Sequence, residues 1–237
     1  MKKIIHKAEA RGTANHGWLN SKFSFSFANY FDPEKIHFGA LRVINNDIIA
    51  PGTGFGTHPH DNMEIISIPL RGGLAHKDSM GNSSVINTGE IQVMSAGSGI
   101  QHSEYNASTT EDGEFLQIWI FPNKKDVTPR YDQLEIEASQ INNQLGQILS
   151  PNPDDDGVWI HQNAWFHMGE FTEEKNLSYS LKNKTNGIYA FLIEGEAKIA
   201  DEKLSKRDAL GICEVDEIAL EMQAGSKLLL IEVPMEF

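Results

Sequence analysis

The sequence predicts an all-β protein built from two copies of one antiparallel unit. Short apolar or alternating segments, divided by Gly, Asn, Asp and Pro, recur along the 237 residues, and this spacing is typical of β-sandwiches and barrels. Helical periodicity is scarce, and the best candidate for a short helix or an irregular link is RYDQLEIEASQINNQLGQ, residues 130–147. A weak internal repeat relates the two halves of the chain.

The expected strands follow one another in a regular order. Each is an alternating or continuously apolar run of strand length that ends at a turn-forming residue. The segments are FGALRVINND, MEIISIPLRGG, SSVINTGEIQVMSAG and EFLQIWIFP in the first half, and GIYAFLIEGEAKIA and SKLLLIEV in the second.

The repeat pairs three segments of the first half with three of the second. IPLRGGLAH parallels FLIEGEAKI, GEIQVMSAG parallels KRDALGICE, and EFLQIWIF parallels SKLLLIEV. Between residues 126 and 157 the composition shifts to Asn, Gln, Ser, Pro and Asp, which is typical of a junction. We therefore predict an N-terminal domain over 1–130, a linker region over 131–157 and a C-terminal domain over 158–237.

Charge and cysteine content exclude several classes of function. Acidic residues outnumber basic ones by 33 to 20, so the net charge of −13 disfavours direct binding to nucleic acid or to an anionic membrane. No apolar run reaches the ~18 residues of a membrane span, and the start MKKIIHKAEARG lacks the apolar core of a secretory signal. The one cysteine, Cys213, lies in an apolar stretch and is interpreted as a core residue. We expect a cytoplasmic protein.

Two short histidine motifs indicate a metal site. THPHDNME contains His58 and His60, and QHSEYN contains His102 and Glu104. Alternate residues of a strand point to the same face, so each pair projects together, and two such strands on opposite walls of a barrel aim four donors at one point. A His-x-His pair alone is weak evidence, because surface and core histidines are common, but the second pair strengthens the interpretation.

The donor set favours a transition metal with catalytic character. Three imidazoles and one carboxylate suit Fe, Mn, Ni, Cu or Zn, whereas Mg or Ca would want more carboxylates. Four protein donors leave about two positions open on an octahedral ion, while structural zinc sites usually contain cysteine and fill every position. In the repeat, Leu181 corresponds to His58 and Asn183 corresponds to His60. Because no histidine follows His167 in the chain, the metal chemistry belongs to the first half.

The motifs resemble those of the pirin family in the cupin superfamily. GTGFGTHPHDNMEI followed by GEIQVMSAGSGIQHSEYN looks like the two metal motifs of its short bacterial quercetinases. LRVINNDIIAPGTGFGTHPH, HKDSMGNSSVINTGE, FLQIWIFPNKKDVTPRYDQ and IHQNA also resemble family segments in order. This resemblance implies a bicupin, two antiparallel barrels packed face to face, in which the C-terminal cupin lacks metal ligands.

The resemblance also implies the ligand set. The family's ligands fall on His58, His60, His102 and Glu104. Glu64 competes as the carboxylate, because many cupins place a ligand glutamate shortly after the second histidine. An ideal strand would put Glu64 about 13 Å beyond His60, so it would reach the metal only through a bend or bulge, and we prefer Glu104.

The activity implied by the resemblance is that of a quercetin 2,3-dioxygenase. Such an enzyme opens the central ring of a flavonol with O2 and releases carbon monoxide, and Glu104 would accept the proton of the flavonol 3-hydroxyl. We expect Fe(II), with Mn, Ni, Cu and Zn as alternatives, and expect the slot for the flat substrate to be lined by Phe38, Phe55, Met94 and Trp119.

Two other functions stay open at this point. The chain is alternatively a metal-binding regulatory module with protein partners, or a cupin enzyme acting on another small oxygenated substrate.

Overall fold

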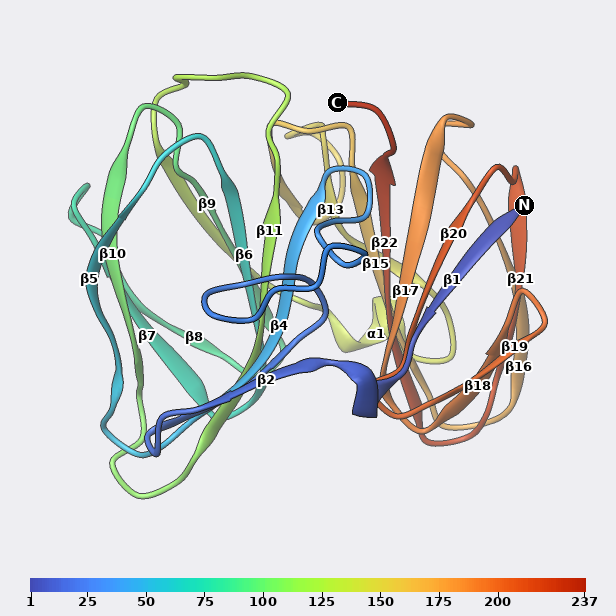
Figure 1. Ribbon diagram of the computed structural model, residues 1–237, viewed down its shortest axis with the longest axis horizontal. Coiled ribbons are helices and arrows are strands. Elements are labelled where there is room, and N and C mark those ends of the chain that lie inside the picture. Colours follow the sequence, from blue (N-terminus) through green and yellow to red (C-terminus); the bar gives the residue numbers. More distant parts are fainter.

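The computed structural model describes residues 1–237 and confirms the all-β class. Twenty-two strands form four sheets, arranged as two side-by-side halves (Figure 1). The one α-helix, α1 (Ala138–Ile141), lies in the segment predicted as a helix or irregular link. The strands are β1 (Lys2–His6), β2 (Gly12–Asn15), β3 (Leu19–Phe23), β4 (Leu41–Ile49), β5 (Gly54–His60), β6 (Glu64–Arg71), β7 (Gly73–Asp78), β8 (Ser83–Asn87), β9 (Glu90–Ser95), β10 (Ile100–Asn106), β11 (Gly113–Ile120), β12 (Arg130–Glu135), β13 (Gly146–Ser150), β14 (Val158–Trp159), β15 (Trp165–Phe171), β16 (Lys175–Ser180), β17 (Asn186–Glu194), β18 (Glu196–Ile199), β19 (Glu202–Ser205), β20 (Ala209–Cys213), β21 (Glu217–Met222) and β22 (Ser226–Pro234).

The two halves share one topology, which confirms the repeat. In the first half a seven-stranded sheet, β12-β9-β6-β11-β4-β3-β2, is accompanied by a four-stranded sheet, β5-β10-β7-β8. In the second half the sheets are β1-β20-β17-β22-β15-β13-β14 and β16-β21-β18-β19. The glycines matched in the repeat, Gly72 and Gly195, occupy the same turn in each half, and both have positive φ, which glycine adopts without strain.

Strand pairing also identifies the residue of the second half that corresponds to His58. His58 pairs with His102, and in the second half the corresponding pair is Tyr179 and Ile218. The sequence repeat had matched His58 with Leu181, and this match is wrong, because the connection that follows β16 is longer than the one that follows β5. Tyr179 and Ile218 both belong to an apolar cluster inside the second half.

One edge strand crosses the boundary between the halves. β1 pairs antiparallel with β20, so the N-terminus completes the large sheet of the second half. The matching edge of the first half is β12, which pairs with β9. No helix is both long and apolar enough to cross a membrane.

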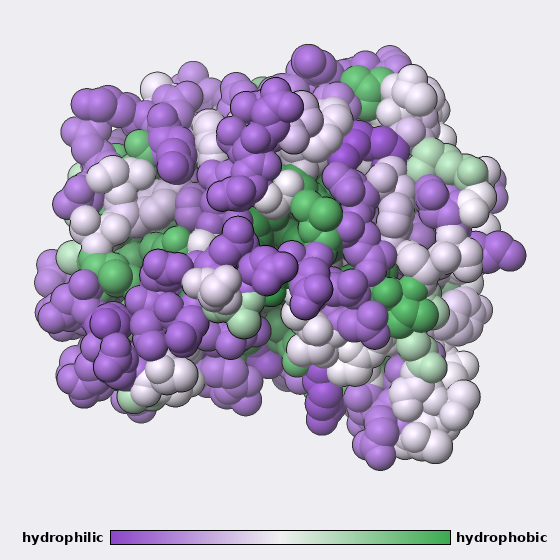
Figure 2. Space-filling model, turned by 180° about the vertical axis from the view of Figure 1, so that it is seen from behind, coloured by the Kyte–Doolittle hydropathy of each residue, from purple (hydrophilic) through white to green (hydrophobic).

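A continuous apolar layer joins the two halves. The large sheets pack against each other through a cluster of 28 buried residues, drawn from strands of both halves. Phe38 belongs to this layer and lies against Tyr189 and Gly211 of the second half. Hydrophilic residues predominate on the face shown in Figure 2, and hydrophobic ones gather mainly near its middle, where the halves meet.

Alternation along β10 sets up the site. Its residues are alternately buried and accessible, as expected for a strand with one face toward the interior of the first half. His102 and Glu104 both lie on the buried face. The four-stranded sheet therefore presents these two side chains to the interior.

Candidate metal centre

Two neighbouring strands bring the predicted ligands together. His58 and His60 lie on β5, and His102 and Glu104 lie on β10, which pairs antiparallel with β5. His102 stands directly opposite His58, and the register shifts between His102 and Glu104. The four residues thus come from paired strands of one sheet, rather than from opposite walls as the sequence suggested.

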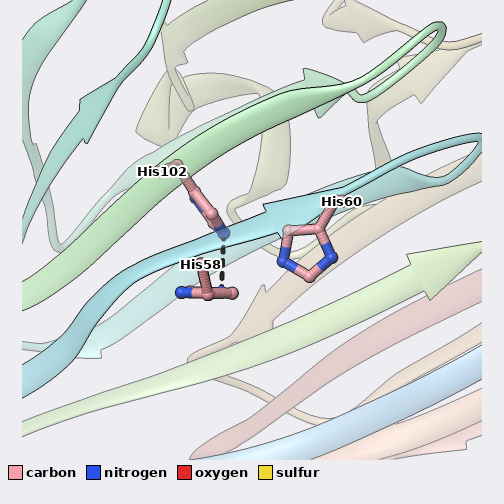
Figure 3. A group of neighbouring side chains, drawn as sticks. All are labelled: His58, His60 and His102. Carbon is pink, nitrogen blue, oxygen red and sulfur yellow. Dashed lines mark hydrogen bonds between the residues drawn. The ribbon is translucent and has the colours of Figure 1, made fainter.

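The three imidazoles converge on one point. Nε2 of His58 and Nε2 of His102 are 3.1 Å apart, and the ring of His60 turns toward both from the end of β5 (Figure 3). One nitrogen from each ring lies within 4.8 Å of the others. Nδ1 of His58 donates to the carbonyl of Gly56 at 2.8 Å if it carries the proton, which leaves Nε2 free to bind an ion.

Burial keeps the rings of His60 and His102 neutral. It lowers the pKa of His60 to about 4, with the neighbouring His58 adding to the effect. It lowers the pKa of His102 to about 2, again helped by His58 and His60. At neutral pH both side chains therefore carry the lone pair that a metal needs.

Glu104 is held at the inner side of this group. It is buried, and its carboxylate accepts hydrogen bonds from Gln117 Nε2 at 2.8 Å and Ser67 Oγ at 3.2 Å. Burial raises its pKa to about 7 although both hydrogen bonds oppose the shift. A donor atom of Glu104 lies within 4.8 Å of His102 and of His76, which is directly opposite Glu104 on β7.

The residues fit a transition-metal ion. Two nitrogen ligands at right angles, each about 2.1 Å from an ion, stand roughly 3 Å apart, close to the separation of the two Nε2 atoms. Nδ1 of His102 is buried and has no hydrogen-bond partner. Nε2 of the same ring is the nitrogen that faces the imidazole of His58. Neutral imidazoles with one carboxylate suit a borderline divalent ion rather than calcium or magnesium.

Glu64 lies outside this group. Its carboxylate accepts a 2.6 Å hydrogen bond from Ser95 Oγ, and it belongs to neither of the two clusters that could hold a metal. Burial raises the pKa of Glu64 to about 7. The nearby charge of Arg130 opposes part of this shift. The geometry therefore favours Glu104 as the carboxylate of the site.

A cavity of about 670 Å³ opens beside the histidines. His58, His60 and Glu104 form part of its lining, which places three of the four candidate ligands at its wall. The remaining wall mixes small and polar residues with six aromatic ones, which are Trp18, Phe23, Phe27, Tyr30, Phe55 and Trp119. A cavity of this size and lining suits a small flat ligand.

Two of the four predicted wall residues line the cavity. Phe55 and Trp119 do so, and the Trp119 ring meets His60 edge-to-face with centroids 5.0 Å apart. Phe38 and Met94 do not. Phe38 packs between the halves, and Met94 is fully buried with Ile65, because the sequence does not reveal which face of the sheet each residue occupies.

Several polar residues of the site were missed by sequence reasoning. His76 lies outside both histidine motifs, yet it is buried next to Glu104 and its Nε2 lies 3.4 Å from Asp78. Asn45 and Asp47 also line the cavity. The available signal was the polar run NND inside an otherwise apolar strand, which is costly unless those groups have a role.

Family models match both halves of the chain. The pirin model matches residues 5–120, and the model of the quercetinase C-terminal cupin domain matches residues 147–233. The two halves described above are therefore two cupin domains. These matches confirm the resemblance seen in the sequence motifs.

Whole-chain relatives agree with the family models. A protein of Escherichia coli K12 named quercetin 2,3-dioxygenase is 42% identical over 230 residues, covering 97% of this chain and 98% of the relative. A pirin-like protein of Caulobacter vibrioides is 36% identical over 222 residues, covering 93% and 95%. The crystal structure of the bacterial pirin YhhW from Escherichia coli in complex with nickel(II) superposes with a TM-score of 0.93 at 39% identity, covering 98% of this chain and 99% of that one.

Proposed function

The chain belongs to the pirin family, and on this premise we propose that it is a metal-dependent dioxygenase of the quercetin 2,3-dioxygenase type. It would open the central ring of a flavonol with O2 and release carbon monoxide. One observation carries the proposal: the imidazoles of His58, His60 and His102 converge, a donor atom of the buried Glu104 lies within 4.8 Å of His102, and His58, His60 and Glu104 line a cavity that also contains six aromatic side chains.

The metal-binding residues we propose are His58, His60, His102 and Glu104. The nickel complex of the relative YhhW supports a divalent transition metal at a site of this kind. Fe(II) is our choice for the native ion, because dioxygen chemistry uses a redox-active metal, with Mn, Ni, Cu and Zn as alternatives. When bound, the ion supplies Lewis-acid and redox chemistry for the reaction with O2.

Glu104 is the proposed proton acceptor. Its carboxylate faces the cavity, and burial raises its pKa to about 7, which suits a general base near neutral pH. In our proposal it takes the proton of the flavonol 3-hydroxyl. Gln117 and Ser67 hold the carboxylate in place while it does so.

The aromatic wall would orient the substrate. Phe27 meets Trp119 edge-to-face with centroids 5.3 Å apart, and Trp18 meets Phe55 at the same distance. Such rings offer large apolar faces to a planar polyphenol and exclude water from the reacting carbon atoms. This wall supports a flavonol better than a small aliphatic substrate.

The test compares turnover in the wild type and two variants. The protein is loaded anaerobically with Fe(II), Mn(II) or Ni(II), then mixed with quercetin and O2 while the visible absorbance and released carbon monoxide are followed. We expect turnover in the wild type and its loss in His60→Ala and Glu104→Ala. Met80→Ala, a change of an exposed side chain in the turn between β7 and β8, is the control. A metal-loaded wild type that turns over no flavonol would favour a regulatory module instead.

A further inference from the structure

We propose that Asn45 and Asp47 form a hydroxyl-recognition subsite that selects polyhydroxylated aromatic ligands. The inference rests on the proposed function, because it concerns the cavity beside the same metal centre. It goes further by assigning ligand selection to two residues on the wall opposite the histidines.

Both side chains are built into the cavity wall. Asn45 and Asp47 are two residues apart on β4, so they share a face, and both line the cavity. They are only 1% and 2% exposed. The intervening Asn46 has the opposite orientation and donates to Glu114, so it is partnered away from the cavity.

Each side chain leaves an acceptor without a donor. Oδ1 of Asn45 and Oδ1 of Asp47 are buried and have no hydrogen-bond partner within the protein. An unpaired buried acceptor is costly, and native proteins rarely keep two neighbouring ones without a use. Burial raises the pKa of Asp47 to about 7, and Ser21 on the adjacent strand offsets this only in part.

The position of these acceptors sets the kind of ligand. Asn45 stands opposite Gln117 in the pairing of β4 with β11, and Gln117 donates to Glu104. Neighbouring strands are about 4.8 Å apart, and Asp47 lies about 7 Å further along β4. The acceptors therefore lie roughly the width of one or two aromatic rings from Glu104.

Hydroxyl groups are the donors that fit. A ligand that places one hydroxyl at Glu104 needs further hydroxyls about one ring away to satisfy Oδ1 of Asn45 and Asp47. Six aromatic side chains in the cavity wall offer stacking to the carbon skeleton. A flavonol with hydroxyl groups on its outer rings meets these requirements, whereas one carrying only the 3-hydroxyl leaves both acceptors unpaired.

The test measures binding without turnover. Nickel-loaded protein is titrated anaerobically with quercetin and with 3-hydroxyflavone, which lacks the additional hydroxyls, and tryptophan fluorescence gives each Kd. We expect the wild type to bind quercetin more tightly than 3-hydroxyflavone. Asp47→Ala should weaken quercetin binding by about 10- to 100-fold, the range for a hydrogen bond to a charged group, and leave 3-hydroxyflavone nearly unchanged. Asn45→Ala should act in the same direction.

Asn46→Ala is the matched control. It removes a buried polar group from the same strand on the other face, so it should leave the ratio of the two Kd values unchanged. Thermal unfolding separates recognition from a structural role. Asp47→Ala should keep or raise Tm, because it removes a buried carboxyl with an unpaired oxygen. A lowered Tm with an equal loss of affinity for both flavonols would overturn the inference.

Catechol, a single ring with two hydroxyls, distinguishes the inference from the proposed function. If the wild type binds neither flavonol but binds catechol, and Asp47→Ala abolishes this, the flavonol activity fails and the subsite stands. Flavonol turnover with an unchanged Kd ratio in Asp47→Ala overturns the subsite and leaves the activity. Binding of none of the three ligands overturns both.

Discussion

The indole of Trp119 lies close enough to the histidines to report on metal binding. Its ring meets His60 edge-to-face at 5.0 Å, and it lines the same cavity. We predict that nickel quenches tryptophan emission in the wild type and that Trp119→Phe removes most of this response. His60→Ala should weaken the nickel affinity by at least about 10-fold. Loss of a residue that orients a metal ligand already lowers metal affinity by about this factor, and loss of the ligand itself should lower it at least as much. The measurement is a fluorescence titration.

Quenching that persists unchanged in Trp119→Phe would contradict this placement. Trp159 and Trp165 do not line the cavity and are internal controls, and Trp159 stacks with Arg130.

Single residues show what sequence motifs can and cannot predict at a site. His58, His60 and His102 were found by their two-residue spacing, and the structure brings one nitrogen of each within 4.8 Å of the others. His76 was missed because its position beside Glu104 depends on the pairing of β7 with β10. Spacing within one strand is visible in a sequence, whereas contact across strands requires the register.

At the scale of elements, the close approach of β5 to β10 depends on Gly54. A Cβ at this position would collide with the backbone of Glu104 and Tyr105. We predict that Gly54→Ala pushes β5 away from β10 and lowers metal affinity by about 10- to 100-fold, as the loss of an orienting contact does. Isothermal titration with nickel is the measurement.

Gly56→Ala is the matched control for this change. Gly56 lies two residues further along β5, and a Cβ there meets only Tyr105 Oη, at 3.9 Å. The carbonyl of residue 56 that contacts His58 is kept. Equal losses of affinity in both variants would show that the strand contact is not the cause.

The strand β1 carries a buried histidine that makes stability depend on pH. His6 lies 2.8 Å from Tyr189 Oη through Nδ1, and burial, helped by the charges of Lys35 and Arg11, lowers its pKa to about 4. The unfolded chain binds this proton near pH 6.5, so the folded state loses stability as pH falls from 6.5 toward 4. We predict that His6→Gln, which does not titrate, loses about 2 kcal/mol less stability than the wild type between pH 7 and pH 5.

Urea unfolding at the two pH values measures this difference. Burial also lowers the pKa of His167 and of His60 to about 4, and these residues, unchanged in the variant, contribute to the remaining acid sensitivity. Parallel losses of stability in the two proteins would mean that His6 is protonated or exposed in the native state.

Strand existence was predictable here, but strand partnership was not. Alternation and turn residues indicated β6, β9, β11, β17 and β22, and all are present. Nothing in MKKIIH indicates that β1 pairs with β20, about 200 residues away, because a two-residue period defines a face and not a neighbour. The repeat predicted two similar halves, and this was confirmed by their shared strand order.

At the scale of the whole molecule, the layer between the halves is the main source of their cohesion. Phe38, from the first half, is 6% exposed and packs against strands of the second. We predict that Phe38→Ala costs about 3–5 kcal/mol, the range for removing a buried phenylalanine. Phe31→Ala is the control, because Phe31 is 74% exposed and its loss should cost less than about 0.5 kcal/mol. Chemical denaturation of both variants provides the comparison.

This shared layer also implies that metal bound in the first half stabilises the second. The cluster of 28 residues contains side chains from both large sheets, so separating the halves would expose it, and we expect one cooperative unfolding transition. An ion that binds only the folded protein then stabilises the whole chain by about 2.7 kcal/mol at 100 times its Kd. For a protein of this size the corresponding rise in Tm is about 5–10 °C.

Calorimetry with and without nickel tests this coupling, and His102→Ala should abolish the rise. Hydrogen exchange adds the decisive readout, since amides of β17 and β22, in the half without the histidines, should gain protection when nickel binds. This follows because their slowest exchange requires the same global opening that metal binding makes rarer. Two separate transitions, of which nickel raises only one, would show instead that the halves unfold independently and that the apolar layer does not couple them.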